Sequence, residues 1–189
     1  MTIIVTGGAG FIGSNFIHEW FSNENEDLIN IDCLTYAGNL ENLKVLNENK
    51  LYHFYKNRIG DKSDIEKILN RFNPRAIINF AAESHVDKSI YGPESFFKTN
   101  VMETLSLLEV TKNYYDQMPE ISRKKFKFIH ISTDEVFGSL QINEKPFKES
   151  NPYLPNSPYA ASKAASDHLV RSFNKTHKLP CIISNCSNN

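Results

Sequence analysis

A tyrosine and a lysine that stand four residues apart, Tyr159 and Lys163, form a pair whose spacing suggests chemistry. On a helix, residues at this separation lie on the same face. An ammonium group close to a phenol favours the phenolate and lowers its pKa, so the tyrosine could act as a base near neutral pH. The lysine could also hydrogen-bond the ribose of a nicotinamide nucleotide. Because this spacing is common in helices, it indicates catalysis only together with the other motifs of the chain.

Two adjacent acids, Asp134 and Glu135, lie just beyond the end of a predicted buried strand, after Ser132 and Thr133. In an open parallel sheet, the carboxyl ends of the strands face the ligand crevice. Repulsion between neighbouring carboxylates raises one pKa, so that one group can serve as an acid and the other as a base. Most such pairs are solvated turns, but the position at a strand end favours a catalytic role here.

A glycine-rich segment, residues 6–13, lies between the first predicted strand and the first predicted helix. Glycines at positions 7, 10 and 13 suit a tight turn, a close approach to a pyrophosphate and close packing of the helix on the sheet. The N-terminus of the helix would offer free N–H groups to the phosphates. Asp32, which ends the second predicted strand, could bond an adenosine ribose and would repel a 2′-phosphate, so NAD is expected rather than NADP. The open alternatives are a plain glycine turn and a strand-capping aspartate.

Short apolar runs alternate with amphipathic stretches along the chain. We predict strands at residues 3–5, 28–31, 51–55, 76–80, 126–131 and 181–183, and helices at residues 12–21, 64–72, 95–115 and 162–176. This alternation predicts an α/β fold, a Rossmann-type doubly wound parallel sheet with helices on both faces. Residues 143–158 contain four prolines, Pro146, Pro152, Pro155 and Pro158, and are predicted to form a loop, either a flap over the substrate or a surface connection.

The composition is typical of a globular domain, because 40% of the 189 residues are hydrophobic and 23% are charged. A net charge of −1 offers no basic surface for nucleic acid, and no apolar run is long enough to cross a membrane. The N-terminus lacks the features of a signal peptide, so a cytoplasmic location is expected. Cys33, Cys181 and Cys186 are expected to be reduced thiols. His85 and Asp87 lack a third ligand, so no metal site is expected.

Together these motifs resemble those of the extended short-chain dehydrogenase/reductase family. Within that family the sequence is similar to the dTDP-glucose 4,6-dehydratases over residues 32–39, 81–89, 132–138, 159–167 and 185–189. The triplet at residues 133–135 is the most specific match. Epimerases of the family lack the acidic pair, and GDP-mannose dehydratases and UDP-glucuronate decarboxylases typically carry Thr-Ser-Glu there. Relatives continue past the position of Asn189 into a smaller substrate-binding domain. We therefore expect residues 1–189 to be an NAD-binding Rossmann domain that lacks most of that C-terminal domain.

The resemblance also implies a role for each motif residue. Tyr159, assisted by Lys163, would take the proton of the sugar 4-hydroxyl as hydride passes from C4 to NAD, and Thr133 would bond the C4 oxygen. Glu135 would then remove the C5 proton and Asp134 would protonate the departing 6-hydroxyl, before hydride returns to C6. The implied substrate contacts are Ser84, Thr133 and Asn188. The implied NAD contacts are Gly7, Gly10, Phe11, Ile12, Gly13, Asp32, Cys33, Leu34, Thr35, Arg58, Ile59, Ala81, Ala82, Thr99, Tyr159, Lys163 and Asn189.

One residue departs from the family pattern at this site, and three functions stay open. Arg58 stands where an acidic residue usually lies beside the adenine, whereas Ile59 is retained and its backbone could still bond the ring. The first function is the NAD-dependent conversion of dTDP-glucose to dTDP-4-keto-6-deoxyglucose and water, by a protein that is a homodimer when full length. The second is an epimerase or decarboxylase of nucleotide sugars. The third is a non-catalytic NAD-binding module.

Overall fold

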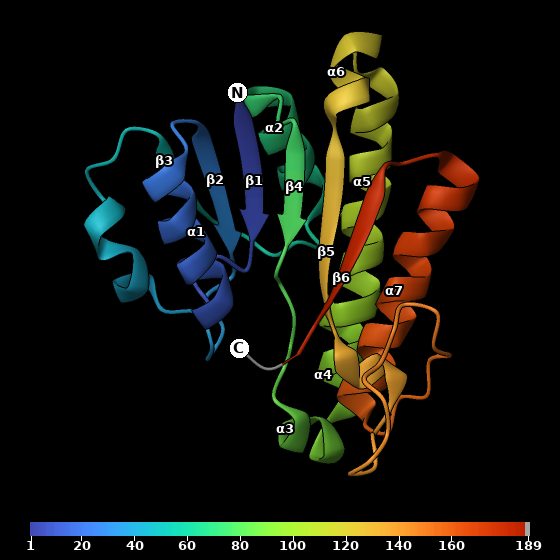
Figure 1. Cartoon of the computed structure of the whole chain (residues 1–189). Helices are drawn as coiled ribbons and strands as arrows, with labels where there is room; N and C mark the ends of the chain where they lie inside the picture. The colour runs from blue at the N-terminus through green and yellow to red at the C-terminus, as the bar shows by residue number, and fades with distance from the viewer. Residues whose placement is uncertain (188–189) are drawn as a thin grey trace.

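The chain is built around a parallel sheet, shown in the computed structural model of Figure 1, which describes residues 1–187. Within these residues the sheet has six strands in the order β3-β2-β1-β4-β5-β6. The strands are β1 (Thr2–Thr6), β2 (Asp27–Asp32), β3 (Tyr52–Lys56), β4 (Ala76–Asn79), β5 (Lys127–Thr133) and β6 (Cys181–Cys186). This strand order is that of a dinucleotide-binding Rossmann fold. The predicted fold class is confirmed.

Helices cover both faces of the sheet (Figure 1). They are α1 (Phe11–Asn23), α2 (Lys62–Phe72), α3 (Val86–Tyr91), α4 (Pro93–Phe96), α5 (Thr104–Gln117), α6 (Glu120–Lys125) and α7 (Pro158–His177), with 3-10 turns at η1 (Leu40–Leu46) and η3 (Asp134–Phe137). The helix predicted at residues 95–115 is interrupted by a π-helical stretch, η2 (Phe97–Glu103). Among the helices that the structure describes, none has the length and apolarity needed to span a membrane.

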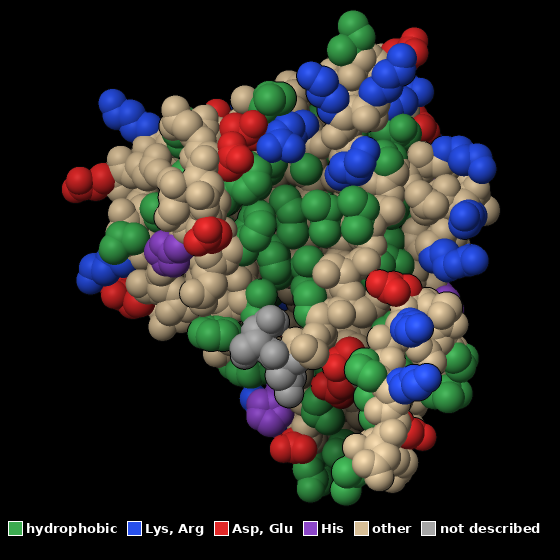
Figure 2. Space-filling view, viewed as in Figure 1, with side chains coloured by type: hydrophobic (Ala, Val, Ile, Leu, Met, Phe, Trp, Pro, Cys, Tyr) green, Lys and Arg blue, Asp and Glu red, His purple; other side chains and the backbone are tan. Residues whose placement is uncertain are grey.

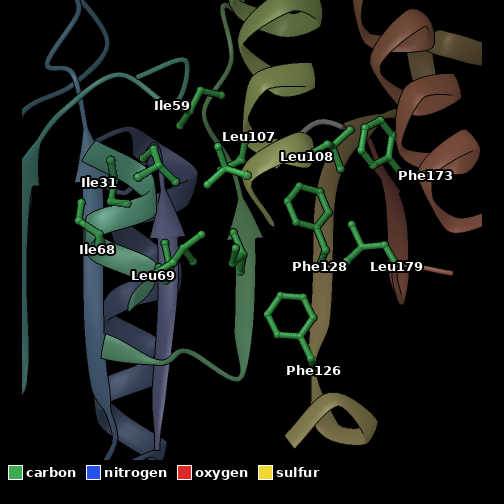
Figure 3. Close-up of a cluster of buried hydrophobic side chains, with 14 of the residues drawn as sticks. Ile31, Ile59, Ile68, Leu69, Leu107, Leu108, Phe126, Phe128, Phe173 and Leu179 are labelled. Atoms are coloured by element: carbon green, nitrogen blue, oxygen red, sulfur yellow. The ribbon is translucent and has the colours of Figure 1, made fainter. Parts of the chain in front are cut away.

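The two faces of the sheet bury two separate apolar clusters, because successive side chains of a strand point to opposite faces. One cluster lies beneath α2, α5 and α7 and includes Ile77, Leu108 and Phe128 (Figure 3). The other lies beneath α1 and includes Val5 and Ile17. These buried strand residues form near-continuous apolar runs, as strands buried on both faces do.

The face of β5 and β6 next to α1 is less well covered than the rest of the sheet. Ile129 pairs with Ile182 in the register of β5 and β6, and Ile182 is 46% exposed. Ile129 and Ile131 are only partly buried, whereas Phe128 and His130 on the opposite face are buried. Figure 2 shows the resulting apolar area between α1 and the β6 edge.

Candidate functional site

A cleft of ≈ 390 Å³ lies where the chain leaves the carboxyl ends of β1, β2, β4 and β5. β1 and β4 are neighbours in the sheet, and the chain continues from them to helices on opposite faces. Open α/β sheets bind ligands at such a topological switch point. Most of the expected binding residues line this cleft: Gly7, Gly10, Phe11, Ile12, Gly13, Asp32, Cys33, Thr35, Arg58, Ile59, Ala81, Ala82, Ser84, Thr99, Tyr159 and Lys163.

The glycine loop forms one wall of the cleft, and two of its glycines are required by the backbone itself. Gly7 has a φ of +70°, and an added Cβ would lie 2.6 Å from the backbone nitrogen of Ala81. A Cβ on Gly13 would collide with the carbonyl oxygen of Gly7, so Gly13 allows α1 to pack against the loop. Gly10 is different, because its added Cβ would lie 3.3 Å from the Gly7 oxygen and 4.0 Å from the Ala37 oxygen, with no closer contact.

The N-terminus of α1 points its first N–H groups into this loop without a capping side chain. Gly10 is the N-cap residue, and the first helical backbone bond runs from the Ser14 nitrogen to the Gly10 oxygen. The N–H groups of the first turn therefore have no partner within the helix. Such groups and the positive end of the helix dipole make a site for a phosphate.

Asp32 closes the loop from the end of β2. Its carboxylate accepts hydrogen bonds from the backbone nitrogens of Ala9 (3.0 Å) and Leu34 (2.8 Å). An ionised carboxylate has about four acceptor positions, so it retains capacity for a ribose hydroxyl. Leu34 has a φ of +55° and its N–H bonds Asp32, but Leu34 does not line the cleft described above. Its expected cofactor contact stays a prediction.

Arg58 does not stand free beside the cleft, because Glu103 holds it. The Arg58 Nε and Nη2 both donate to Glu103 Oε1, at 2.8 and 2.6 Å, and the Glu103 side chain is buried. The cleft is also lined by residues for which the sequence predicted no contact: Ile31, Ala37, Gly38, Asn57, Phe80, Glu83, Glu103, Ile131 and Ser132. Glu103 stands one helical turn after Thr99, and this spacing could have predicted that both residues face the cleft.

The start of α7 places Tyr159 and Lys163 on the floor of the cleft. Ser157 is the N-cap residue and its hydroxyl accepts from the Ala160 nitrogen at 3.0 Å, while Pro158 occupies the first turn. The Tyr159 nitrogen donates to the Ser89 hydroxyl at 3.1 Å. Both side chains are buried and both line the cleft. Tyr159 and Lys163 thus lie in the same cleft as the glycine loop.

The expectation that Lys163 lowers the pKa of the Tyr159 phenol is wrong. Burial raises the pKa of Tyr159 to about 12, the negative charge of Glu135 adds to this rise, and the nearby Thr133 hydroxyl opposes it. The Lys163 ammonium instead donates to the Ile131 carbonyl oxygen at 2.7 Å. Burial also lowers the pKa of Lys163 to about 8.

The acid pair lies beside the phenol rather than in the wall of the cleft. Thr133, Asp134 and Glu135 are not among the lining residues, but the charges of both acids raise the pKa of Tyr159. The Thr133 hydroxyl accepts from the Glu135 nitrogen at 3.2 Å and so fixes the turn η3. Burial, and then repulsion by Asp134, raises the pKa of Glu135. A raised pKa makes Glu135 a stronger base once ionised.

Two further expectations concern the C-terminus and the proline-rich loop. Asn188 and Asn189 lie outside the described residues. In the loop at residues 143–158, the Tyr153 hydroxyl donates to Asp167 Oδ2 at 2.9 Å, and the Leu154 nitrogen donates to the Val136 oxygen. The loop is therefore attached to α7 and η3, and whether it also acts as a flap stays open.

The fold and the cleft define a dinucleotide-binding domain of the Rossmann type. The family model described as "GDP-mannose 4,6 dehydratase" matches residues 4–189. The chain therefore belongs to this family of extended short-chain dehydrogenases/reductases, as its motifs predicted.

Similar proteins narrow the comparison within the family. A dTDP-glucose 4,6-dehydratase from Xanthomonas campestris pv. campestris (strain B100) is 53% identical over 188 residues, which are 100% of this chain and 53% of that protein. The structure of the Bacillus anthracis enzyme of that name, in complex with NAD, has a TM-score of 0.86 and 43% identity, and the match covers 100% of this chain and 55% of that one. The Streptomyces venezuelae enzyme, solved with NAD and TYD bound, has a TM-score of 0.88 and 39% identity over 98% of this chain and 55% of that one. The chain thus spans about half the length of these relatives.

Proposed function

We propose that residues 1–189 are the NAD-binding domain of a nucleotide-sugar 4,6-dehydratase that acts on dTDP-glucose. The fit to NAD rests on this chain's own residues. The glycine loop has no room for side chains at Gly7 and Gly13, the first turn of α1 has unpartnered N–H groups, and Asp32 ends β2 beside them. An acid at this position accepts from a ribose 2′-hydroxyl and disfavours a 2′-phosphate.

The observation that carries the dehydratase reading is the grouping of one phenol, one hydroxyl and two carboxyls at the end of β5. Tyr159 would take and return the proton of the sugar 4-hydroxyl, and Thr133 would hold the C4 oxygen. Glu135 would remove the C5 proton, and Asp134 would protonate the departing 6-hydroxyl. NAD, when bound, would supply the hydride acceptor at C4 and the donor at C6. Loss of water needs an acid and a base on one sugar, and this site has both.

Product analysis of the longer protein tests this function. With dTDP-glucose we expect a 4-keto-6-deoxy sugar nucleotide, whereas recovery of an epimer or a pentose would favour the epimerase or decarboxylase. Glu135→Gln should block water loss, while the exposed loop variant Glu149→Gln should retain it. Normal water loss by Glu135→Gln would contradict the base role. NAD binding without any turnover by the longer protein would favour the non-catalytic module.

The location and assembly of the longer protein belong to the same proposal. We expect a cytoplasmic homodimer that pairs through the helices at residues 95–115 and 162–176. Phe97 and Met102, on η2, are 41% and 58% exposed and would supply apolar contacts. Light scattering coupled to size exclusion is the test, since Met102→Lys should then yield monomers. A monomeric unaltered protein would contradict the dimer.

A further inference from the structure

Three ionisable side chains lie buried together beneath the floor of the cleft. Lys163 and Asp167 stand one helical turn apart on α7, and His130 faces them from β5. Lys163 is 3% exposed, and Asp167 and His130 are each 1% exposed. A buried charge is tolerated only when other charges or hydrogen bonds compensate it. The proposed function uses Lys163 but assigns no role to Asp167 or His130.

His130 is uncharged, and its hydrogen bonds define which ring nitrogen carries the proton. Thr6, Asn79 and His130 are register partners on β1, β4 and β5. The Thr6 hydroxyl donates to Asn79 Oδ1 at 2.5 Å, so the Asn79 amide nitrogen faces His130 Nδ1 at 3.1 Å as a donor. The proton of His130 is therefore on Nε2, which lies 3.1 Å from the Ser166 hydroxyl. Burial, and then the charge of Lys163, lowers the pKa of His130 well below its usual value.

Asp167 is held by donors from three other parts of the chain. Its Oδ2 accepts from the hydroxyls of Ser132 (2.7 Å) and Tyr153 (2.9 Å), and from the Asn185 amide nitrogen (3.4 Å). Burial raises the pKa of Asp167, and these three hydrogen bonds together with the charge of Lys163 oppose that rise. Its Oδ1 has no hydrogen-bond partner among the described residues, and His130 Nε2 lies 3.5 Å from it.

The surroundings of the pair contain one cationic side chain, Lys163. Facing it and Asp167 are neutral His130 on β5, Tyr153 on the proline-rich loop and Cys186 on β6. Tyr159 precedes Lys163 on α7 and faces the acid pair of η3. Asp167 is thus the buried anion that acts on Lys163, and no direct hydrogen bond joins the two within residues 1–187.

We propose that Asp167 is a positioning residue that keeps Lys163 an ammonium ion directed at the Ile131 carbonyl and the cleft. Asp167 does not line the cleft, so it acts through Lys163. The ammonium lies 2.7 Å from the Ile131 oxygen in a buried site. Burial lowers the pKa of Lys163 to about 8, and the charge of Asp167, one helical turn further along α7, opposes that fall. The inference rests on the proposed function only in assigning Lys163 to a ribose; the state of the lysine is a property of the chain alone.

Titration of Lys163 by NMR tests the proposal directly. The 189-residue chain is labelled with 15N,13C-lysine, and the Lys163 signal is assigned by its loss in Lys163→Arg. The midpoint of the Lys163 titration is then measured between pH 6 and 11 without cofactor. Asp167→Asn, which keeps the side-chain size, should lower the midpoint by about one pH unit, since an adjacent opposite charge shifts a pKa by about 1–3 units. Tyr153→Phe is the matched control, because it removes a hydrogen bond from Asp167 but leaves its charge; it should shift the midpoint by less than half as much. An unchanged midpoint in Asp167→Asn, or an equal shift in both variants, overturns the proposal.

A second measurement needs no variant at Asp167. In the unaltered chain the 13Cγ shift of Asp167 should have its ionised value at pH 7, and a protonated value would overturn the proposal even if Asp167→Asn does not fold. The affinity for NAD separates this inference from the proposed function. If the titration midpoint of Lys163 falls in Asp167→Asn as expected but the unaltered chain does not bind NAD, the proposed function fails and the inference holds. If NAD binds but Lys163 does not shift in Asp167→Asn, the inference fails and the proposed function holds.

Discussion

Replacing two glycines of the loop, one at a time, separates folding from cofactor binding. In Gly13→Ala the new Cβ meets the Gly7 carbonyl oxygen and lies 2.8 Å from the Gly8 Cα, and neither backbone atom can rotate away. Overpacking costs up to ~3 kcal/mol, and alanine recovers ~1 kcal/mol of helix propensity, so the net loss should be about 2 kcal/mol. For a chain of this size that loss lowers Tm by about 4–8 °C.

Gly10→Ala should have the opposite effect, with little change in stability and a loss of NAD affinity. Its Cβ lies 3.3 Å from the Gly7 oxygen, which a small shift accommodates, so stability should change by less than about 0.5 kcal/mol. The methyl group nevertheless occupies the side from which a pyrophosphate would approach, and NAD affinity should fall at least about tenfold, or ~1.4 kcal/mol. Urea unfolding and calorimetric titration with NAD measure the two effects. Gly92→Ala, whose Cβ would meet only the Lys88 oxygen at 3.9 Å, is the control. Unchanged NAD affinity in Gly10→Ala would refute the assignment of this loop to the phosphates.

Three other predictions concern charged residues. Asp32→Ala should weaken NAD binding in a fluorescence titration by about tenfold, and an unchanged affinity would count against the ribose contact. Arg58→Ala leaves the buried Glu103 carboxylate without its partner and should cost about 2 kcal/mol in urea unfolding. Lys67→Ala, which breaks an exposed ion pair, should cost clearly less, and equal losses would contradict the difference in burial. Because the pKa of Lys163 falls from 10.5 to about 8 on folding, the unfolded chain binds more protons between these pH values and stability should rise with pH there, by up to about 3 kcal/mol. Lys163→Met should abolish this rise, and a rise of the same size in the variant would exclude Lys163 as its source.

The strands, the parallel sheet and the residues at the strand ends could be predicted from local sequence. The runs around Val5, Ile29 and Ile77 are apolar and β-branched, and those around Val5 and Ile77 are each followed by a helical pattern. Residues next to strand ends then belong to the cleft by topology alone, which is why Asp32 and the glycine loop could be assigned before the structure was known. Element ends differed by a few residues, for instance at β6, which continues to Cys186.

Features that depend on distant partners could not be predicted in the same way. Arg58 and Glu103 are 45 positions apart, and His130 and Asp167 come from different elements. The π-helical stretch η2 has the same apolar composition as the helix around it, so periodicity predicted one helix where the structure has three segments. It is this stretch that brings Thr99 and Glu103 to the cleft.

The phenol of Tyr159 shows how packing decides the chemistry of a motif. The spacing to Lys163 predicted a lower pKa, but α7 buries the ring while the ammonium bonds the Ile131 oxygen, and burial dominates. With a pKa of about 12, Tyr159 is protonated at neutral pH and is a hydrogen-bond donor in the chain alone. The proposed role of Tyr159 as a base would therefore need further positive charge near the ring, and an oxidised nicotinamide bound in the cleft that Tyr159 lines would supply it.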